Sequence, residues 1–259
     1  GLYMLQGAGG NIGVFIGSDG VFMIDDQYAP MTEKIKVAIR NLTKQSVKFL
    51  VNTHWHSDHT EGNTNMKQAG AVIIAHEKVR ERLLYGGEIK ALNHVVAPAP
   101  IAALPVITFS ENVTFYWNGD TLNIEHIGPA HTDGDSVIYF KKANVVHTGD
   151  LYFNGFYPFI DASSGGSVAG MVEAIENILS RTDESTKIIP GHGSLSDKKE
   201  LEAYRQMLAT VHTRIRSLKN KGKTLDEIVA AKPTADFDEK WGKGLLAPDK
   251  WVEVVYSSL

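Results

Sequence analysis

The chain opens with short apolar runs separated by turns that contain glycine. Residues 2–6, 11–17 and 21–24 have the length and apolar content of strands, and each run is bounded by glycine or aspartate. Such runs predict β-strands joined by tight turns. The rest of this half is expected to contain a helix at 31–41, a strand at 47–52, a short helix, a strand at 71–75 and a helix at 77–85.

A proline-rich stretch separates this half from a second series of strands. Residues 97–105 contain Pro98, Pro100 and Pro105, which cannot sustain a helix and so predict an extended connection. An amphipathic helix over residues 168–179 is expected to lead into a strand at 187–189. Between the connection and this helix, strands are expected at 106–109, 113–117, 121–127, 136–140 and 144–148.

Helices dominate the remaining residues. Apolar side chains recur at helical spacing from Leu201 to Leu218, and Ser194 or Ser196 is expected to cap the start of that helix. Two shorter helices are expected at 224–231 and 249–258. We therefore interpret residues 1–259 as one layered α/β domain, with two β-then-α halves at about 1–96 and 105–195 and C-terminal helices over 196–259.

Three histidines and one aspartate lie within six residues just after the strand expected at 47–52. Residues 54–59 read His-Trp-His-Ser-Asp-His, and imidazole nitrogens and carboxylate oxygens suit Zn²⁺ and its neighbours in the first transition row. His54 and His56 project the same way from an extended segment and can share one ion. Asp58 and His59 follow at the turn, where they can reach a second ion. Taken alone, the cluster also fits chance or a structural zinc site.

Two ions need further ligands, and three other strand ends offer them. His131 lies in the turn 128–135, Asp150 follows the strand expected at 144–148, and His192 lies within Pro-Gly-His-Gly. Glycine and proline permit tight turns that leave a polar side chain at a strand end. Because a closed structural site takes four ligands rather than seven, the combined set favours a catalytic site. The remaining histidines are interpreted as surface or core residues: His76, His94, His126, His147 and His212.

These segments resemble, in order, the five metal-binding motifs of the metallo-β-lactamase superfamily. Asp25 resembles the first motif, residues 54–59 the second, and His131, Asp150 and His192 the third to the fifth. The resemblance covers about residues 10–195. It implies a four-layer αββα sandwich with the metal site at one edge of the sheets.

The resemblance also implies a ligand set. His54, His56 and His131 would hold one metal, Asp58, His59 and His192 would hold the other, and Asp150 would bridge the two. Asp25 would orient a ligand loop by hydrogen bonding, although Asp26 can take its place or both can cap the following helix. Two Zn²⁺ ions per chain are expected, and Mn or Fe also suits these donors.

The predicted function is hydrolysis at a dinuclear metal site. Two ions about 3.5 to 4 Å apart can share a hydroxide whose pKa is lowered toward neutrality, and they polarise the scissile carbonyl. Asp58 is the candidate catalytic residue because its carboxylate can orient the hydroxide or move its proton. The full aspartate and histidine set resembles lactonases and glyoxalase II, so the expected substrate is a small ester, lactone, thioester or amide.

Hydrolysis of β-lactams is the first alternative. The lactamase subclass that is known best has a cysteine where this chain has Asp150, and a second subclass lacks an acidic bridge there, whereas this chain contains no cysteine. Cysteine-type lactamases also carry a lysine soon after this position, which holds the substrate carboxylate, and no lysine or arginine follows Asp150 closely. The second alternative is a non-hydrolytic protein, either an iron-containing redox protein or a metal-binding one.

Aromatic residues indicate where the walls of a substrate site lie. Trp55 lies inside the metal loop, and Phe153, Phe156 and Tyr157 follow Asp150. We expect them to form a rim for apolar or aromatic groups, although core packing explains such clusters equally well. Residues 3–10 resemble the glycine-rich hairpin that can flap over the site in this superfamily.

Composition narrows the choice of partners and of compartment. With 26 basic residues, 30 acidic residues and a net charge of −4, the chain lacks the pattern of a nucleic-acid-binding protein. No apolar stretch approaches the roughly eighteen residues that a membrane span needs. A small-molecule substrate is therefore the expected partner, and the oligomeric state stays open. The absence of cysteine and the first residue, Gly1, are compatible with export, so a soluble periplasmic or secreted protein is expected.

Overall fold

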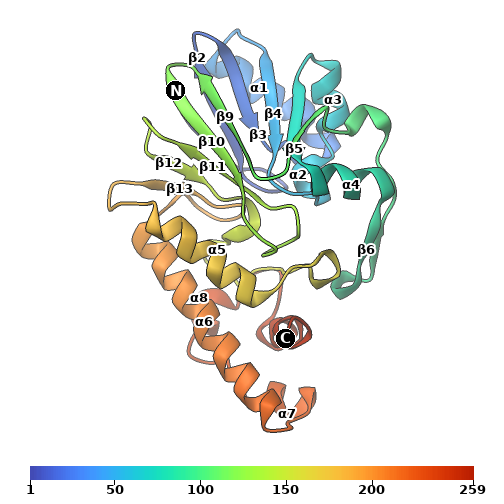
Figure 1. Cartoon of the computed structure of the whole chain (residues 1–259), viewed down its shortest axis with the longest axis vertical. Coiled ribbons are helices and arrows are strands. Elements are labelled where there is room, and N and C mark those ends of the chain that lie inside the picture. The colour runs from blue at the N-terminus through green and yellow to red at the C-terminus, as the bar shows by residue number, and fades with distance from the viewer.

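Two six-stranded sheets pack against each other in the computed structural model, which describes residues 1–259 (Figure 1). The first sheet has the order β1-β2-β3-β4-β5-β8 and the second has the order β14-β13-β12-β11-β10-β9. The strands of the first sheet are β1 (Leu2–Leu5), β2 (Ile12–Gly17), β3 (Gly20–Ile24), β4 (Val47–Asn52), β5 (Val72–His76) and β8 (Ile107–Phe109). Those of the second are β9 (Asn112–Trp117), β10 (Asp120–His126), β11 (Ser136–Phe140), β12 (Val145–His147), β13 (Lys187–Ile189) and β14 (Ser196–Asp197).

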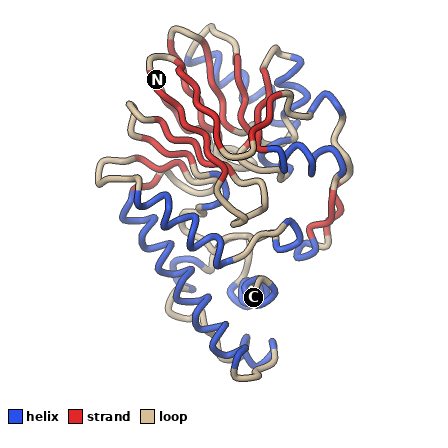
Figure 2. Tube along the Cα trace, in the orientation of Figure 1, coloured by secondary structure: helices blue, strands red, loops and turns tan.

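Helices cover the outer faces of the two sheets (Figure 2). The first group consists of α1 (Thr32–Leu42), α2 (Ser57–Thr60), α3 (Asn63–Gln68) and α4 (Glu77–Tyr85). The second group consists of α5 (Val168–Ser180) and α6 (Lys198–Asn220), followed by α7 (Leu225–Ala230), α8 (Asp238–Trp241) and α9 (Pro248–Ser257), of which α7 and α9 pack against α6 below the sheets (Figure 1). None of these helices is both long enough and apolar enough to span a bilayer.

Three separate apolar clusters show that the layers are stacked in the order αββα. Phe22 and Phe140 belong to the cluster between the two sheets. Ile35 of α1 packs on the outer face of the first sheet, and Tyr204 of α6 belongs to the large cluster on the outer face of the second. Each sheet is therefore buried on both faces, which explains why several strands are apolar throughout rather than alternating. The predicted four-layer α/β sandwich is confirmed.

The sheet topology gathers strand ends at one edge. In the first sheet, β3, β4 and β5 run parallel to one another, so the chain leaves them at the same edge. In the second sheet, β12 and β13 are also parallel. Because β10 and β12 are both antiparallel to β11, the loop after β10 lies at the same edge as the loop after β12. The residues that follow these strands include all the candidate metal ligands.

The structure differs from the sequence prediction in several elements, and β14 and α8 were not predicted at all. β8, which we assigned to the second half, pairs in parallel with β5 and completes the first sheet. Two short strands, β6 (Gly87–Ile89) and β7 (His94–Val96), form a separate hairpin that was not predicted. The cap of α6 is Asp197, whose carboxylate accepts from the backbone N–H of Glu200 at 3.0 Å, rather than Ser194 or Ser196.

Candidate metal centre

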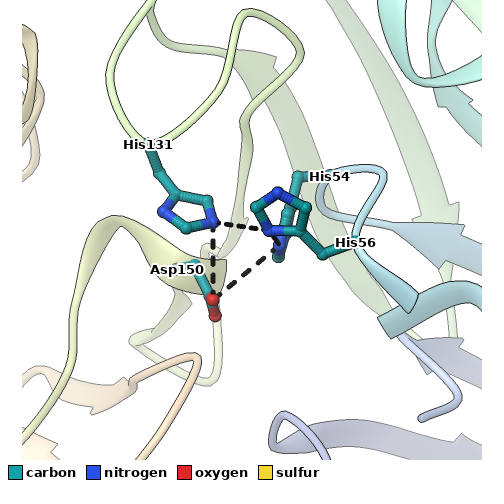
Figure 3. Close-up of side chains that lie close together, drawn as sticks. All are labelled: His54, His56, His131 and Asp150. Atoms are coloured by element: carbon teal, nitrogen blue, oxygen red, sulfur yellow. Dashed lines mark hydrogen bonds and ion pairs between the residues drawn. The ribbon is translucent and has the colours of Figure 1, made fainter. Parts of the chain in front are cut away.

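The seven predicted ligands lie together at the edge where the parallel strands end. His54 and His56 follow β4, and Asp58 and His59 lie on α2. His131 comes from the loop between β10 and β11. Asp150 lies on a 3-10 turn after β12 (Gly149–Leu151), and His192 follows β13. Two donor groups result, one of His54, His56, His131 and Asp150 and one of Asp58, His59 and His192 (Figure 3 shows the first).

The first donor group presents three imidazole lone pairs to one point. His54 Nε2 and His131 Nε2 lie 3.1 Å and 2.9 Å from His56 Nδ1. The other nitrogen of each ring is occupied: His54 Nδ1 lies 3.0 Å from the Thr53 hydroxyl and His131 Nδ1 lies 2.8 Å from the Phe159 carbonyl. A neutral ring that donates there keeps a bare lone pair on the nitrogen that faces the centre. Three such lone pairs repel one another unless a cation lies among them.

Asp161, which no sequence motif indicates, completes this arrangement. Its Oδ2 lies 3.1 Å from His56 Nε2, while the hydroxyls of Ser163 and Ser164 donate to the same carboxylate at 2.6 and 2.5 Å. Asp161 is fully buried. It follows no strand and belongs to no motif, so only tertiary structure reveals its contact with His56. By accepting the Nε2–H, it leaves His56 Nδ1 free to bind a cation.

Asp25 performs the same task in the second donor group. His59 Nδ1 lies 2.8 Å from Asp25 Oδ2, which also accepts from the Thr53 hydroxyl at 2.8 Å. Asp25 has a φ of 59°, a left-handed conformation that aspartate tolerates better than most residues. Asp26 accepts from the backbone N–H of Gly62 instead, and neither aspartate caps α1, whose N-cap is Met31.

Carboxylates and imidazoles alternate around the second group. His192 Nε2 lies 3.2 Å from Asp58 Oδ2 and 3.4 Å from His59 Nε2. Asp58 and His192 are about one-fifth exposed, whereas His59 is fully buried. This side of the centre is therefore the one that solvent and a substrate can reach.

Asp150 lies between the two groups. Its carboxylate oxygens are 3.5 Å from His131 Nε2, 3.1 Å from His59 Nε2 and 3.3 Å from His192 Nε2. The Oδ1 atom is buried and accepts no hydrogen bond. A buried carboxylate oxygen without a donor is costly, and a cation in each group would satisfy it. The residues thus fit a metal-binding centre.

The histidine pKa values differ between the two donor groups. Burial and the neighbouring His59 hold the pKa of His54 well below its usual range, and burial lowers the pKa of His131 to about 4, so both rings are neutral. Burial opposes protonation of His192 as well, but Asp150 and Asp58 raise its pKa to about 9. A proton therefore occupies, in the metal-free protein, a position where a cation would otherwise neutralise the carboxylates.

The glycine-rich segment before β2 packs against this centre and does not hang over it as a free flap. The backbone N–H of Gly10 donates to the Asp58 carbonyl at 3.1 Å. The side-chain amide of Asn11 donates to the carbonyls of Pro190 and Gly193, each at 2.9 Å, on either side of His192. A Cβ on Gly10 would come within 2.0 Å of the His59 ring. Because residue 10 is glycine, the backbone can pack closely against the loops that carry Asp58 and His192 and act as a brace, hydrogen-bonded to both.

The predicted rim residues have different surroundings. Phe153 stacks on His192, with ring centroids 5.1 Å apart, and partly buried Phe156 lies 6.0 Å from Phe153. Tyr157, expected at the rim, lies in the core: it is 1% exposed and stacks on Trp251. Trp55 is also buried, and the guanidinium of Arg82 lies over its ring.

Tyr28 is a further aromatic residue of this region that no sequence motif indicates. This tyrosine is 37% exposed. Burial and the nearby Asp58 and Glu61 raise the pKa of its phenol. The negative charges of Asp58 and Glu61 therefore disfavour ionisation of this phenol.

The family of the protein follows from the comparison of residues 6–196, which match the model of the metallo-beta-lactamase superfamily. The chain belongs to this superfamily. The predicted superfamily is confirmed, the cluster of His54, His56, His131 and Asp150 fits its metal-binding motif, and the chain is a hydrolase of the superfamily.

Curated relatives share about a quarter of their residues with this metallo-β-lactamase-type chain. A hydroxyacylglutathione hydrolase, GloC, of Haemophilus influenzae is 27% identical over 150 residues, which are 58% of this chain and 70% of that protein. A hydroxyacylglutathione hydrolase of Pelagibacter ubique is 26% identical over 165 residues, or 61% of this chain and 57% of the other.

Solved structures share the metallo-β-lactamase fold at lower identity. The sec-alkylsulfatase Pisa1 from Pseudomonas sp. has a TM-score of 0.74 and 18% identity, and the match covers 99% of this chain but 48% of that one. The DIM-1 metallo-β-lactamase has a TM-score of 0.61 and 20% identity, with 81% and 91% covered. The chain thus spans about half the length of the alkylsulfatase and most of the lactamase.

Proposed function

We propose that the protein is a dinuclear-zinc hydrolase that cleaves a small ester, lactone, thioester or amide. The observation that carries this proposal is the position of Asp150 between two donor groups, with oxygens 3.1 to 3.5 Å from His59, His131 and His192. Donor groups that share a carboxylate are suited to two ions held a few ångströms apart. The hydroxyacylglutathione hydrolases among the relatives support a thioester or related acyl substrate.

The residues around the metal centre have different roles in the proposed hydrolysis. Zinc ions bound there would lower the pKa of a shared water toward neutrality and so supply a hydroxide nucleophile. Asp58, which is partly exposed and lies 3.2 Å from His192 Nε2, is placed to orient that nucleophile and to move its proton. Asp25 and Asp161 keep His59 and His56 in the tautomers that leave the facing nitrogens bare.

A substrate panel with metal-loaded protein tests this function. We expect turnover of at least one ester, lactone, thioester or amide, and loss of that turnover after chelation with recovery on adding Zn²⁺. Nitrocefin and a carbapenem belong in the same panel, because lactam hydrolysis at the rate of the preferred acyl substrate would favour the lactamase alternative. Turnover of none of the acyl compounds by protein that carries its metals would refute the proposal.

A further inference from the structure

A cavity of about 480 Å³ beside the metal loop has no role in the steps above. One wall comes from α2 and α3 and includes Ser57 and Thr64, and the other comes from the segment 94–100 between α4 and β8. The backbone N–H of Ala99 donates to the Leu83 carbonyl at 2.8 Å and fixes that second wall against α4. The volume of the cavity lies in the range of a typical small-molecule site.

The cavity adjoins the metal centre through the ligand motif itself. Trp55 and Ser57, which flank His56 in the sequence, both line it. Ser57 is partly exposed and precedes Asp58, the ligand on the accessible side of the centre. Thr60 and Glu61, which follow His59, line it as well, so the cavity lies along the segment that carries four of the candidate ligands.

The side chains that line the cavity determine which chemical groups can bind in it. Val95, Pro98 and Ala99 make one wall largely apolar, and Val95 is 73% exposed, so an apolar group bound there would remove its surface from water. No lysine or arginine lines the cavity, and Glu61 is its one carboxylate. His94 and the polar side chains of Ser57, Thr60, Thr64 and Asn65 also line it, but no permanent positive charge offsets Glu61, so an uncharged chain is favoured over an anionic one.

We propose that this cavity binds an uncharged aliphatic chain of the substrate whose carbonyl is cleaved at the metal centre. The proposal rests on the proposed hydrolase function and adds the substrate class to it: neutral acyl compounds with an apolar tail. Ala99 and Thr64, on opposite walls, are then specificity-determining residues.

A chain-length series tests the proposal in the metal-loaded protein. With p-nitrophenyl esters from acetate to octanoate, kcat/KM is expected to rise about fourfold for each added methylene until the cavity is filled. In Ala99→Leu and in Thr64→Leu, the ratio of kcat/KM for octanoate to that for acetate should fall at least tenfold. Ala143→Leu, at an exposed turn away from the cavity, is the matched control and should keep the wild-type ratio.

Calorimetric binding of N-octylacetamide, a neutral probe that needs no turnover, separates this proposal from the proposed function. Weaker binding in both cavity variants than in Ala143→Leu is expected even if no ester is cleaved. A chain-length profile that is flat in the wild type, or equal probe binding in all variants, would overturn the cavity assignment while leaving the hydrolase function intact. Failure of every acyl substrate with intact probe binding would refute the hydrolase function alone.

Discussion

At the scale of single residues, two buried carboxylates orient the metal ligands, one for each donor group. Asp161 holds His56 and Asp25 holds His59. We predict that Asp161→Asn weakens binding of one ion about 10- to 100-fold and leaves the other nearly unchanged, while Asp25→Asn does the reverse. Competition titration with a chromophoric chelator and cobalt spectra of each variant measures this. Equal weakening of both ions in both variants would show that the carboxylates act only through general stability.

Asp58 is expected to matter for turnover far more than for folding. Its side chain is about one-fifth exposed and contacts imidazoles of the centre. Replacing it by alanine should lower kcat by roughly 10²- to 10⁴-fold, the range for loss of a positioned acid or base. The melting temperature of the metal-free protein should change little, as in the control Glu184→Ala at an exposed surface. An Asp58→Ala enzyme with wild-type kcat would remove Asp58 from the mechanism.

The clustering of the seven candidate metal ligands could be predicted from sequence because they follow apolar runs that end at one edge of the sheets. Asp161 could not, because it lies in a loop without a strand or motif before it. The aromatic rim was the weakest inference, since Tyr157 has the aromatic side chain of a substrate wall but packs inside the core. Apolar character alone does not distinguish a wall from a core.

At the scale of elements, the glycine loop before β2 is a brace for the ligand loops. Because a Cβ on Gly10 would lie 2.0 Å from the His59 ring, Gly10→Ala forces that ligand to move. We predict a loss of about 1–3 kcal/mol in the free energy of unfolding and weaker binding of one metal ion. Gly87→Ala is the control, since its Cβ would meet Trp55 at an ordinary 3.5 Å. Urea unfolding curves of the two variants compare them, and equal stability would contradict the brace.

The start of α6 provides a second test at this scale. Asp197→Ala should cost about 1 kcal/mol because it removes the acceptor of the Glu200 N–H, whereas exposed Ser194→Ala should cost almost nothing. Thermal unfolding of both variants measures the two losses of stability.

The sequence contains two serines and an aspartate within four residues, and only the backbone geometry shows which of them caps the helix. Similarly, pairing partners rather than composition decided that β8 joins the first sheet.

At the scale of the whole molecule, burial of neutral histidines makes the metal-free protein sensitive to acid. Burial lowers the pKa of His147 to about 4, and this ring accepts a hydrogen bond from the Gly149 N–H. Because the unfolded chain binds a proton at its ordinary pKa of about 6.5, stability should fall as the pH drops from 6.5 toward 4. His192, whose pKa is raised to about 9, acts at higher pH: its contribution is full below about 6.5 and is lost as the pH rises through about 9.

Urea unfolding of chelator-treated protein between pH 4.5 and 8 measures the effect of His147. His147→Asn should lessen the loss of stability below pH 6.5, since one group that must take up a proton on unfolding is gone. An unchanged slope would mean that other groups govern the acid limit. The αββα layering was predictable from the resemblance of the metal motifs together with the alternation of apolar runs and turns, whereas the β6–β7 hairpin, only three residues on each side, gave too short a pattern to recognise.

The most direct test of the account is the number of metal ions that the protein holds at equilibrium. Elemental analysis of protein purified with metal present, then freed of excess by gel filtration, should find two ions per chain in the wild type and fewer in Asp58→Ala. Two ions would match the two donor groups that share Asp150. One ion or none in the metal-replete wild type would contradict the dinuclear centre on which the proposed hydrolysis depends.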